Sequence, residues 1–100
     1  MSDKVTFVSI GTVDPDQADA LSTYATHAPP LLIEAGAVPR MKAKLVEELV
    51  GDGAPQTVFI ADFPNAEAVH EVFASDAYRA LVPARDKAFK KLNFFLVEDF

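Results

Sequence analysis

Hydrophobic and polar positions along this chain predict four strands and two helical regions, and the clearest pattern lies at residues 57–63. Apolar side chains occupy both faces of this stretch. One face carries Phe59, Ala61 and Phe63, and the other carries Val58 and Ile60. A strand with two apolar faces is typically covered on both sides. Pro64 follows directly and is expected to end the strand, because proline cannot donate a hydrogen bond to a neighbouring strand.

The residues before this strand predict a strand and a long helix. Residues 4–13 are rich in β-branched side chains, which favour a strand. Asp14 is a candidate N-cap for a helix that begins at Pro15 and ends at Gly36, where glycine commonly terminates helices. Two consecutive prolines interrupt the apolar stripe of this helix. We therefore expect a kink at residues 27–30.

Residues 37–50 are expected to form the second strand. Odd positions are largely apolar and even positions largely polar, as in a strand with one face in water. Glu47 breaks the alternation, which indicates a bulge or a bend nearby. Residues 51–55 contain two glycines and a proline, and predict the loop of a hairpin with the strand at 57–63.

The residues after Pro64 predict a broken helix and a last strand. Asn65 is the expected N-cap, and Ser75 or Asp76 is expected to start a further turn. Pro83 interrupts the helix again. The apolar spacing predicts a final helix that extends to residue 92, followed by a strand over 93–98.

The resulting order, β-α-β-β-α-β, predicts the α+β ferredoxin-like fold. In this fold a four-stranded antiparallel sheet carries its helices on one face. Three of the four strands are apolar on both faces, so the face without helices needs a partner. We expect that partner to be a second copy of the chain, which would close two sheets into a dimeric α+β barrel.

Composition and charge narrow the classes of protein to consider. The 100 residues are expected to form one domain, 1–100, with 50% hydrophobic residues. Cysteine is absent, which is compatible with a cytoplasmic protein. The net charge of −6 disfavours binding to nucleic acids or to anionic membranes. The N-terminal residues resemble no signal peptide, and no apolar stretch reaches the roughly 20 residues that span a bilayer.

Two stretches, 49–64 and 75–85, resemble family number 1330 of the domains of unknown function, in the dimeric α+β barrel superfamily. The most specific elements are the pair Phe63-Pro64 and the run Ser-x-x-Tyr-x-x-Leu-x-x-x-Arg that ends at Arg85. The resemblance covers residues 7–98. The chain departs from the family pattern at Val50, where an acidic residue is usual, and at Asp62, where glutamate is usual. The resemblance implies the fold and the dimer, and no reaction.

Arg85 and Tyr78 are the first candidates for a binding site. Both fall on the apolar side of the broken helix, seven residues apart. A guanidinium there must pair or extend to solvent. Arg85 is interpreted either as an anchor for a small carboxylate ligand or, as we favour, as the partner of Asp62, Asp86 or a terminal carboxylate. The Tyr78 ring is expected to pack beneath it, with its hydroxyl on a polar partner.

Asp62, His27 and Tyr24 are weaker candidates. Asp62 has apolar neighbours that could raise its pKa, as a general base requires, although it could equally be the partner of Arg85 or cap the loop after Pro64. His27 lies about one turn from Tyr24 on the first helix. It could act in acid–base chemistry or bind haem, but a structural role at the kink is favoured. The superfamily resemblance implies a pocket between this helix and the sheet.

No metal, haem or nucleotide cofactor is expected, because ligand clusters and phosphate-binding loops are missing from the sequence. Phenylalanines of the central strands should fill the barrel and leave no large cofactor cavity. These are Phe59, Phe63, Phe94 and Phe95. The sequence therefore favours a homodimeric protein that binds a small organic carboxylate or serves an accessory role. The alternative is a cofactor-independent enzyme of the monooxygenase or isomerase kind.

Overall fold

The computed structural model describes residues 3–53 and 55–99 of the chain. Four strands and four helices follow one another along the described residues. Their order is β1 (Val5–Val13), α1 (Ala18–Glu34), β2 (Val38–Lys44), β3 (Thr57–Phe63), α2 (Ala66–Ala74), α3 (Asp76–Arg79), α4 (Val82–Ala88) and β4 (Phe89–Val97).

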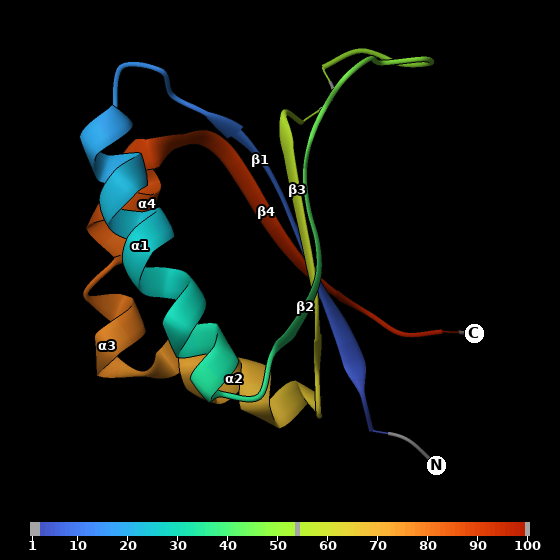
Figure 1. Cartoon of the computed structure of the whole chain (residues 1–100), viewed down its shortest axis with the longest axis vertical. Coiled ribbons are helices and arrows are strands. Elements are labelled where there is room, and N and C mark those ends of the chain that lie inside the picture. The colour runs from blue at the N-terminus through green and yellow to red at the C-terminus, as the bar shows by residue number, and fades with distance from the viewer. Residues whose placement is uncertain (1–2, 54, 100) are drawn as a thin grey trace.

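The strands form one antiparallel sheet in the order β2-β3-β1-β4. All four helices lie on the same side of this sheet, and its other face carries no helix (Figure 1). This arrangement confirms the predicted ferredoxin-like fold, in which the second helical region is broken into α2, α3 and α4.

The core lies between the helices and the inner face of the sheet. Phe7 of β1 is buried at its centre and contacts four other aromatic rings, with centroid distances from 5.0 to 6.3 Å. Ala61 and Phe63 of β3 lie on the same face and are also buried, together with Val69 and Val72 of α2. The strand pattern at 57–63 thus predicted which residues share a face.

Helix α1 differs from the prediction at its start. It begins at Ala18 rather than at Pro15, because Asp14 forms a turn in which its Oδ1 accepts a hydrogen bond from the Asp16 N–H at 3.0 Å. The helix continues through both prolines as one element. The carbonyls of the exposed residues Ala25 and Thr26 lose their helical donors at this point, and water can replace them.

The predicted end of α1 is confirmed. Gly36 has φ +106°, in the left-handed region that favours glycine. Its N–H donates to the Ile33 carbonyl at 3.0 Å, and the Ala37 N–H donates to the Leu32 carbonyl at 2.9 Å. These two bonds form a Schellman motif, which satisfies carbonyls that the last turn leaves without partners.

Strand β2 is shorter than predicted, and its irregularity lies elsewhere. It ends at Lys44, and the register shifts at Arg40 rather than near Glu47. After the shift, Lys42 pairs with Phe59 and Lys44 pairs with Thr57. The segment 45–53 then extends away from the body of the molecule, towards the side without helices (Figure 1). Residue 54 of the predicted hairpin loop lies outside the described residues.

The caps of the helical region are confirmed, and its end is corrected. The Asn65 side chain accepts a hydrogen bond from the Ala68 N–H at 2.8 Å, and the Ser75 hydroxyl accepts one from the Tyr78 N–H at 3.2 Å. Helix α4, however, ends at Ala88 instead of continuing to residue 92. Residue Phe89 already pairs with β1, so pairing within the sheet overrides the helical spacing there.

The face of the sheet without helices is largely apolar. Cross-strand partners share a face, so the register connects one apolar group across all four strands. This group, called the open face below, comprises Val8, Val38, Met41, Ile60, Phe95 and Val97. Phe95 remains 45% exposed and Val38 62% exposed, a large apolar surface for a chain of this size.

Candidate functional site

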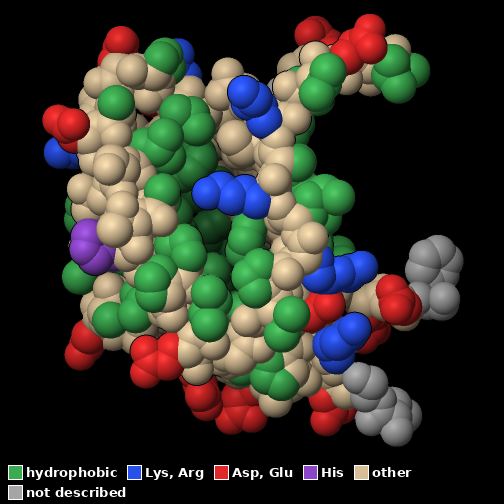
Figure 2. Space-filling model, in the orientation of Figure 1, with side chains coloured by type: hydrophobic (Ala, Val, Ile, Leu, Met, Phe, Trp, Pro, Cys, Tyr) green, Lys and Arg blue, Asp and Glu red, His purple; other side chains and the backbone are tan. Residues whose placement is uncertain are grey.

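A cavity of about 890 Å³ lies between α1 and the inner face of the sheet. Figure 2 shows it as a hollow with apolar side chains in its wall and a basic side chain at its rim. Phe7, Phe59, Phe73, Phe89 and Phe94 contribute aromatic rings to the lining. Its volume falls within the range of small-molecule sites, about 300–1,000 Å³. The pocket that the resemblance implied between this helix and the sheet is therefore observed, whereas the expectation that the phenylalanines leave no large cavity is wrong.

The placement of the four phenylalanines explains this correction. Phe59 and Phe94 line the cavity, whereas Phe63 is buried in the core against Phe7. Phe95 lies on the open face, on the far side of the sheet. The rings are thus divided among three environments, and the separation of α1 from β2 leaves a space between them.

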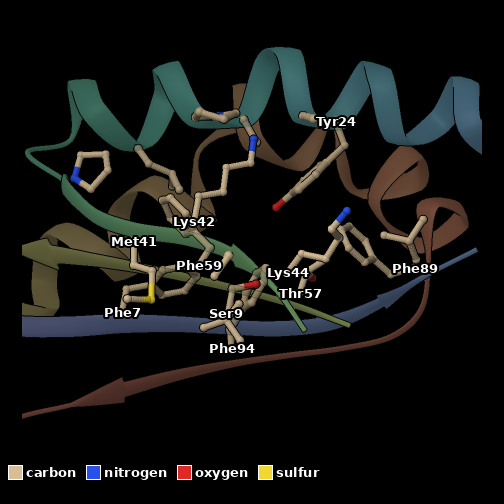
Figure 3. A pocket seen from close by; sticks show the side chains of 18 of the residues that line it. Phe7, Ser9, Tyr24, Met41, Lys42, Lys44, Thr57, Phe59, Phe89 and Phe94 are labelled. Atoms are coloured by element: carbon tan, nitrogen blue, oxygen red, sulfur yellow. The ribbon is translucent and has the colours of Figure 1, made fainter. Parts of the chain in front are cut away.

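Two lysines of β2, Lys42 and Lys44, lie at the cavity. Figure 3 shows their side chains in the space between β2 and α1, where the Tyr24 hydroxyl also points. Both lysines reach this side because of the register shift at Arg40. Within residues 3–53 and 55–99, neither forms an ion pair or a hydrogen bond through its ammonium group. Arg40 also lines the cavity but is bonded to Asp62 at 3.3 Å.

Carboxylates are missing from the described lining of the cavity, although the chain has 15 acidic and 9 basic residues. The local charge is therefore opposite to that of the whole molecule. Sequence reasoning missed both lysines as site residues. The signal was the alternation of polar and apolar residues in 37–50, but the face on which each set lies depends on the bulge.

Tyr24, Tyr78 and Arg85 form a hydrogen-bonded chain beside the cavity. The Tyr24 and Tyr78 hydroxyl oxygens are 2.6 Å apart, and Arg85 Nη1 donates to the Tyr78 hydroxyl at 3.3 Å. The Arg85 guanidinium also lies 5.8 Å from the Tyr78 ring centroid and 5.9 Å from that of Phe94. Tyr24 lines the cavity, whereas Tyr78 is 1% exposed behind it.

The expected placement of Tyr78 and Arg85 is thus observed. Arg85 Nε lies 3.3 Å from Oδ1 of Asp86, one of the three carboxylates considered from the sequence. The Tyr78 ring packs against the guanidinium, and its hydroxyl has polar partners. The contact between Tyr24 and Tyr78 was not foreseen, because the two residues are 54 positions apart.

Burial and hydrogen bonding determine the protonation of Tyr24 and Arg85. Burial raises the pKa of the Tyr24 hydroxyl well above its ordinary value. Tyr24 therefore stays protonated and is a hydrogen-bond donor rather than a base. Partial burial lowers the pKa of Arg85, but its bonds to Tyr78 and Asp86 outweigh this and raise it overall. Arg85 therefore keeps its positive charge.

Asp62 lies away from this site. It pairs with Thr6 and Val38 on the face of the sheet without helices, and its carboxylate accepts a hydrogen bond from the Thr6 hydroxyl at 2.7 Å. Lys4 Nζ lies 3.7 Å from Oδ2 of Asp62, and Arg40 Nη1 lies 3.3 Å from its Oδ1. The Thr6 hydrogen bond and these cations lower the pKa of Asp62. The interpretations of Asp62 as a base with a raised pKa and as the partner of Arg85 are both wrong.

His27 is exposed and does not reach the cavity. Its Nδ1 donates to the Thr23 carbonyl of the preceding turn at 2.9 Å. This bond gives His27 the structural role within α1 that the sequence favoured. Groups of three or more potential metal-binding side chains do not occur among residues 3–53 and 55–99, counting His, Cys, Asp and Glu. Over the same residues, no helix is both long and apolar enough to cross a membrane.

Comparisons with solved structures identify the same fold in proteins of several kinds. The chain is 20% identical to RPA0582 of Rhodopseudomonas palustris, a protein of unknown function, and superposes with a TM-score of 0.85 over 100% of this chain and 85% of that one. It is 21% identical to SnoaB of Streptomyces nogalater, a cofactor-independent oxygenase, with a TM-score of 0.64 and coverage of 99% and 97%.

A third structure is described as a "putative monooxygenase" of Lactobacillus acidophilus. It is 15% identical, with a TM-score of 0.73, and the match covers 98% of this chain and 45% of that one. Identities this low establish the fold alone. No curated protein matches the chain. A family model does match, over residues 7–100, and the chain therefore belongs to the family described as "Domain of unknown function (DUF1330)".

Proposed function

We propose that this protein binds a small, mainly apolar organic acid in the cavity between α1 and the sheet. One observation carries the proposal: the lining combines aromatic and aliphatic walls with Lys42 and Lys44 and includes no carboxylate among the described residues. Apolar walls favour a ligand with a hydrophobic body. Unpaired ammonium groups at the rim favour a negative charge at one end of that ligand.

Binding of 2-naphthoate tests the proposal directly. Calorimetry should detect saturable binding of one molecule per chain, and added salt should weaken it because the lysines are exposed. Lys42→Gln and Lys44→Gln should each weaken binding, by about tenfold or less, since a charge-assisted contact at an exposed site is worth about 1 kcal/mol.

Lys87→Gln is the matched control, because Lys87 is an exposed residue of α4 outside the cavity lining. It should bind 2-naphthoate like the wild type. Naphthalene, which has no charge, should bind with an affinity that none of the three lysine variants changes. Failure of both compounds to bind, or equal effects of all three substitutions, would reject the proposed site.

The open face supports a second part of the proposal, a homodimer in which two sheets stack through these faces. The six residues of the open face have no helix above them, and several are about half exposed. Residues Val46, Leu49 and Val50 of the segment 45–53 add exposed apolar side chains on the same side of the sheet. A second copy would cover both groups, and a stable interface needs about 1,200–2,000 Å² in total.

Sedimentation equilibrium tests this assembly. The wild type should sediment at twice the chain mass of 10.8 kDa. Phe95→Asp should shift it towards the monomer, because the buried charge would lack a partner in the interface. Glu67→Gln, on helix α2, should leave the dimer intact. A wild type that remains monomeric at micromolar concentrations would contradict the proposal.

A second candidate function is oxidation of such a ligand by molecular oxygen without a cofactor. The Tyr24 hydroxyl and the ammonium groups of Lys42 and Lys44 surround an apolar space, and donors of this kind stabilise negative charge that develops on a substrate oxygen. SnoaB, which is described as a cofactor-independent oxygenase, has the same fold. Oxygen consumption with a panel of aromatic phenols tests this candidate, and rates equal to those without protein would count against it.

A further inference from the structure

The hydrogen bonds that link Arg85, Tyr78 and Tyr24 behind the cavity run in one direction, which is determined by the donors and acceptors that each side chain carries. Arginine carries N–H donors and no acceptor, so Arg85 can only donate to the Tyr78 hydroxyl oxygen, at 3.3 Å. The Tyr78 hydroxyl has one hydrogen of its own. Among the residues that the structure describes, its neighbour within hydrogen-bond distance, other than Arg85, is the Tyr24 hydroxyl oxygen at 2.6 Å.

Burial decides where the Tyr78 hydrogen points. Tyr78 is 1% exposed, and among the described residues no buried side-chain oxygen or nitrogen lacks a hydrogen-bond partner. If Tyr24 donated to Tyr78, the Tyr78 oxygen would accept twice and its own hydrogen would have no acceptor. A buried hydrogen-bond donor without an acceptor is unfavourable. Tyr78 therefore donates to Tyr24.

The hydrogen of Tyr24 remains available for a further partner. The Tyr24 side chain lines the cavity, and Figure 3 shows its hydroxyl pointing into the space that Lys42 and Lys44 also enter. Because Tyr24 already accepts from Tyr78, a donor in the ligand would compete with that bond. An acceptor in the ligand completes the chain from Arg85 through Tyr78 and Tyr24, and successive hydrogen bonds in one direction strengthen each other.

We propose that Arg85 and Tyr78 hold the Tyr24 hydroxyl as a hydrogen-bond donor directed into the cavity, so that the ligand places an acceptor oxygen against Tyr24. The oxygen of a carboxylate, a phenolate or a ketone meets this requirement. The inference rests on the proposed function, because it assumes that the cavity holds a ligand. In this scheme Tyr24 contacts the ligand, whereas Tyr78 and Arg85 are positioning residues. The burial of Tyr24, which is the largest cause of its raised pKa, supports the scheme, since the hydroxyl must stay protonated to donate.

A matched pair of uncharged probes separates this hydrogen bond from the effect of the lysines. 2-Acetonaphthone has a carbonyl where 2-isopropenylnaphthalene, of nearly the same shape, has a methylene group. The wild type should prefer the ketone by about tenfold. Tyr24→Phe should remove most of this preference and leave the affinity for the hydrocarbon unchanged.

A double-mutant cycle tests the positioning role of Tyr78. Tyr78→Phe should reduce the preference for the ketone, because the Tyr24 hydroxyl loses the donor that orients it. In the Tyr24→Phe background, the same substitution should cause no further loss of preference. The infrared carbonyl stretch of the bound ketone should move to lower frequency in the wild type and not in Tyr24→Phe. A purely structural role of Tyr78 would change the affinity for both probes equally and would overturn the inference.

The direction of the hydrogen bond between Tyr78 and Tyr24 can also be measured without a ligand. The sequence contains two tyrosines, so ring carbons labelled with ¹³C at Cζ give two signals. In equal volumes of H₂O and D₂O, a slowly exchanging hydroxyl splits its Cζ signal. Tyr78 should show the split signal, because its hydrogen is buried between two oxygens, whereas Tyr24 should exchange rapidly with solvent.

The outcomes distinguish the inference from the proposed function. If neither naphthalene compound nor 2-naphthoate binds, the proposed function fails and the ligand role of Tyr24 fails with it. If the compounds bind but Tyr24→Phe keeps the full preference for the ketone, the inference alone is wrong. A slowly exchanging hydrogen on Tyr24 instead of Tyr78 would overturn the inference whatever binds.

Discussion

Replacement of Arg85 by alanine should lower the stability of the protein, because Arg85 joins α4 to α3 and to β4. Its guanidinium donates to the Tyr78 hydroxyl at 3.3 Å and lies 5.8 and 5.9 Å from the ring centroids of Tyr78 and Phe94. Its bond to Asp86 adds little, since the Asp86 side chain is 65% exposed. Tyr78 keeps its hydrogen bond to Tyr24 in the variant, so no buried group loses its last partner.

The size of the effect follows from these contacts. A hydrogen bond from a charged donor contributes about 1 kcal/mol when it is partly exposed, and each cation–π contact about 0.5 kcal/mol. Arg85→Ala should therefore lose about 2 kcal/mol of unfolding free energy, which corresponds to a fall in Tm of roughly 10 °C for a chain of this length. The Tm of Arg85→Lys should lie between those of the wild type and of Arg85→Ala, because lysine keeps the charge but lacks the planar guanidinium group.

Thermal denaturation followed by circular dichroism, at one fixed protein concentration, measures the effect. Arg79→Ala is the matched control, because Arg79 is exposed on α3 and forms no ion pair with another described residue. It should change the unfolding free energy by at most about 0.5 kcal/mol. If Arg85→Ala melts no lower than Arg79→Ala, the contacts of Arg85 do not stabilise the fold and the reasoning is refuted.

Three further predictions concern groups outside this contact. The hydrogen bond from Thr6 lowers the pKa of Asp62, so the ionised Asp62 stabilises the fold above its ordinary pKa of 3.8. This stabilisation disappears as the pH falls below 3.8. The Tm of the wild type should therefore exceed that of Asp62→Asn at pH 7, and the two values should converge in acid. The pKa of Tyr24 is raised, so unfolding should be favoured above about pH 10, where an unfolded tyrosine ionises, and urea titrations should show a shallower alkaline loss in Tyr24→Phe. Gly36→Ala should cost about 1 kcal/mol or more in chemical denaturation, since φ is +106° and a Cβ would lie 3.1 Å from Pro64; equal stability of the two proteins would refute the left-handed assignment.

Local patterns in the sequence determined the elements and several of their ends. Two apolar faces identified the strand at 57–63, Asn65 predicted the start of α2, and Gly36 predicted the end of α1. The spacing of Tyr78 and Arg85 also placed them together, because seven residues bring two side chains to the same side of a helical region. These features depend on residues that are close in the chain, and so they can be read from it.

The tertiary structure alone decided the site. The register shift at Arg40 brings Lys42 and Lys44 to the cavity, and packing of α1 against the broken helix brings Tyr24 to Tyr78. Asp62 shows the same dependence, since it lies in the strand before Tyr78 but on the opposite face of the sheet from the helices. A slip of one residue exchanges the two faces of a strand, and the distance between a helix and a sheet depends on every side chain between them. Neither the register of a strand nor the distance between a helix and the sheet is determined by a single stretch of sequence. The strands and caps could therefore be predicted, whereas the cavity and its charge could not.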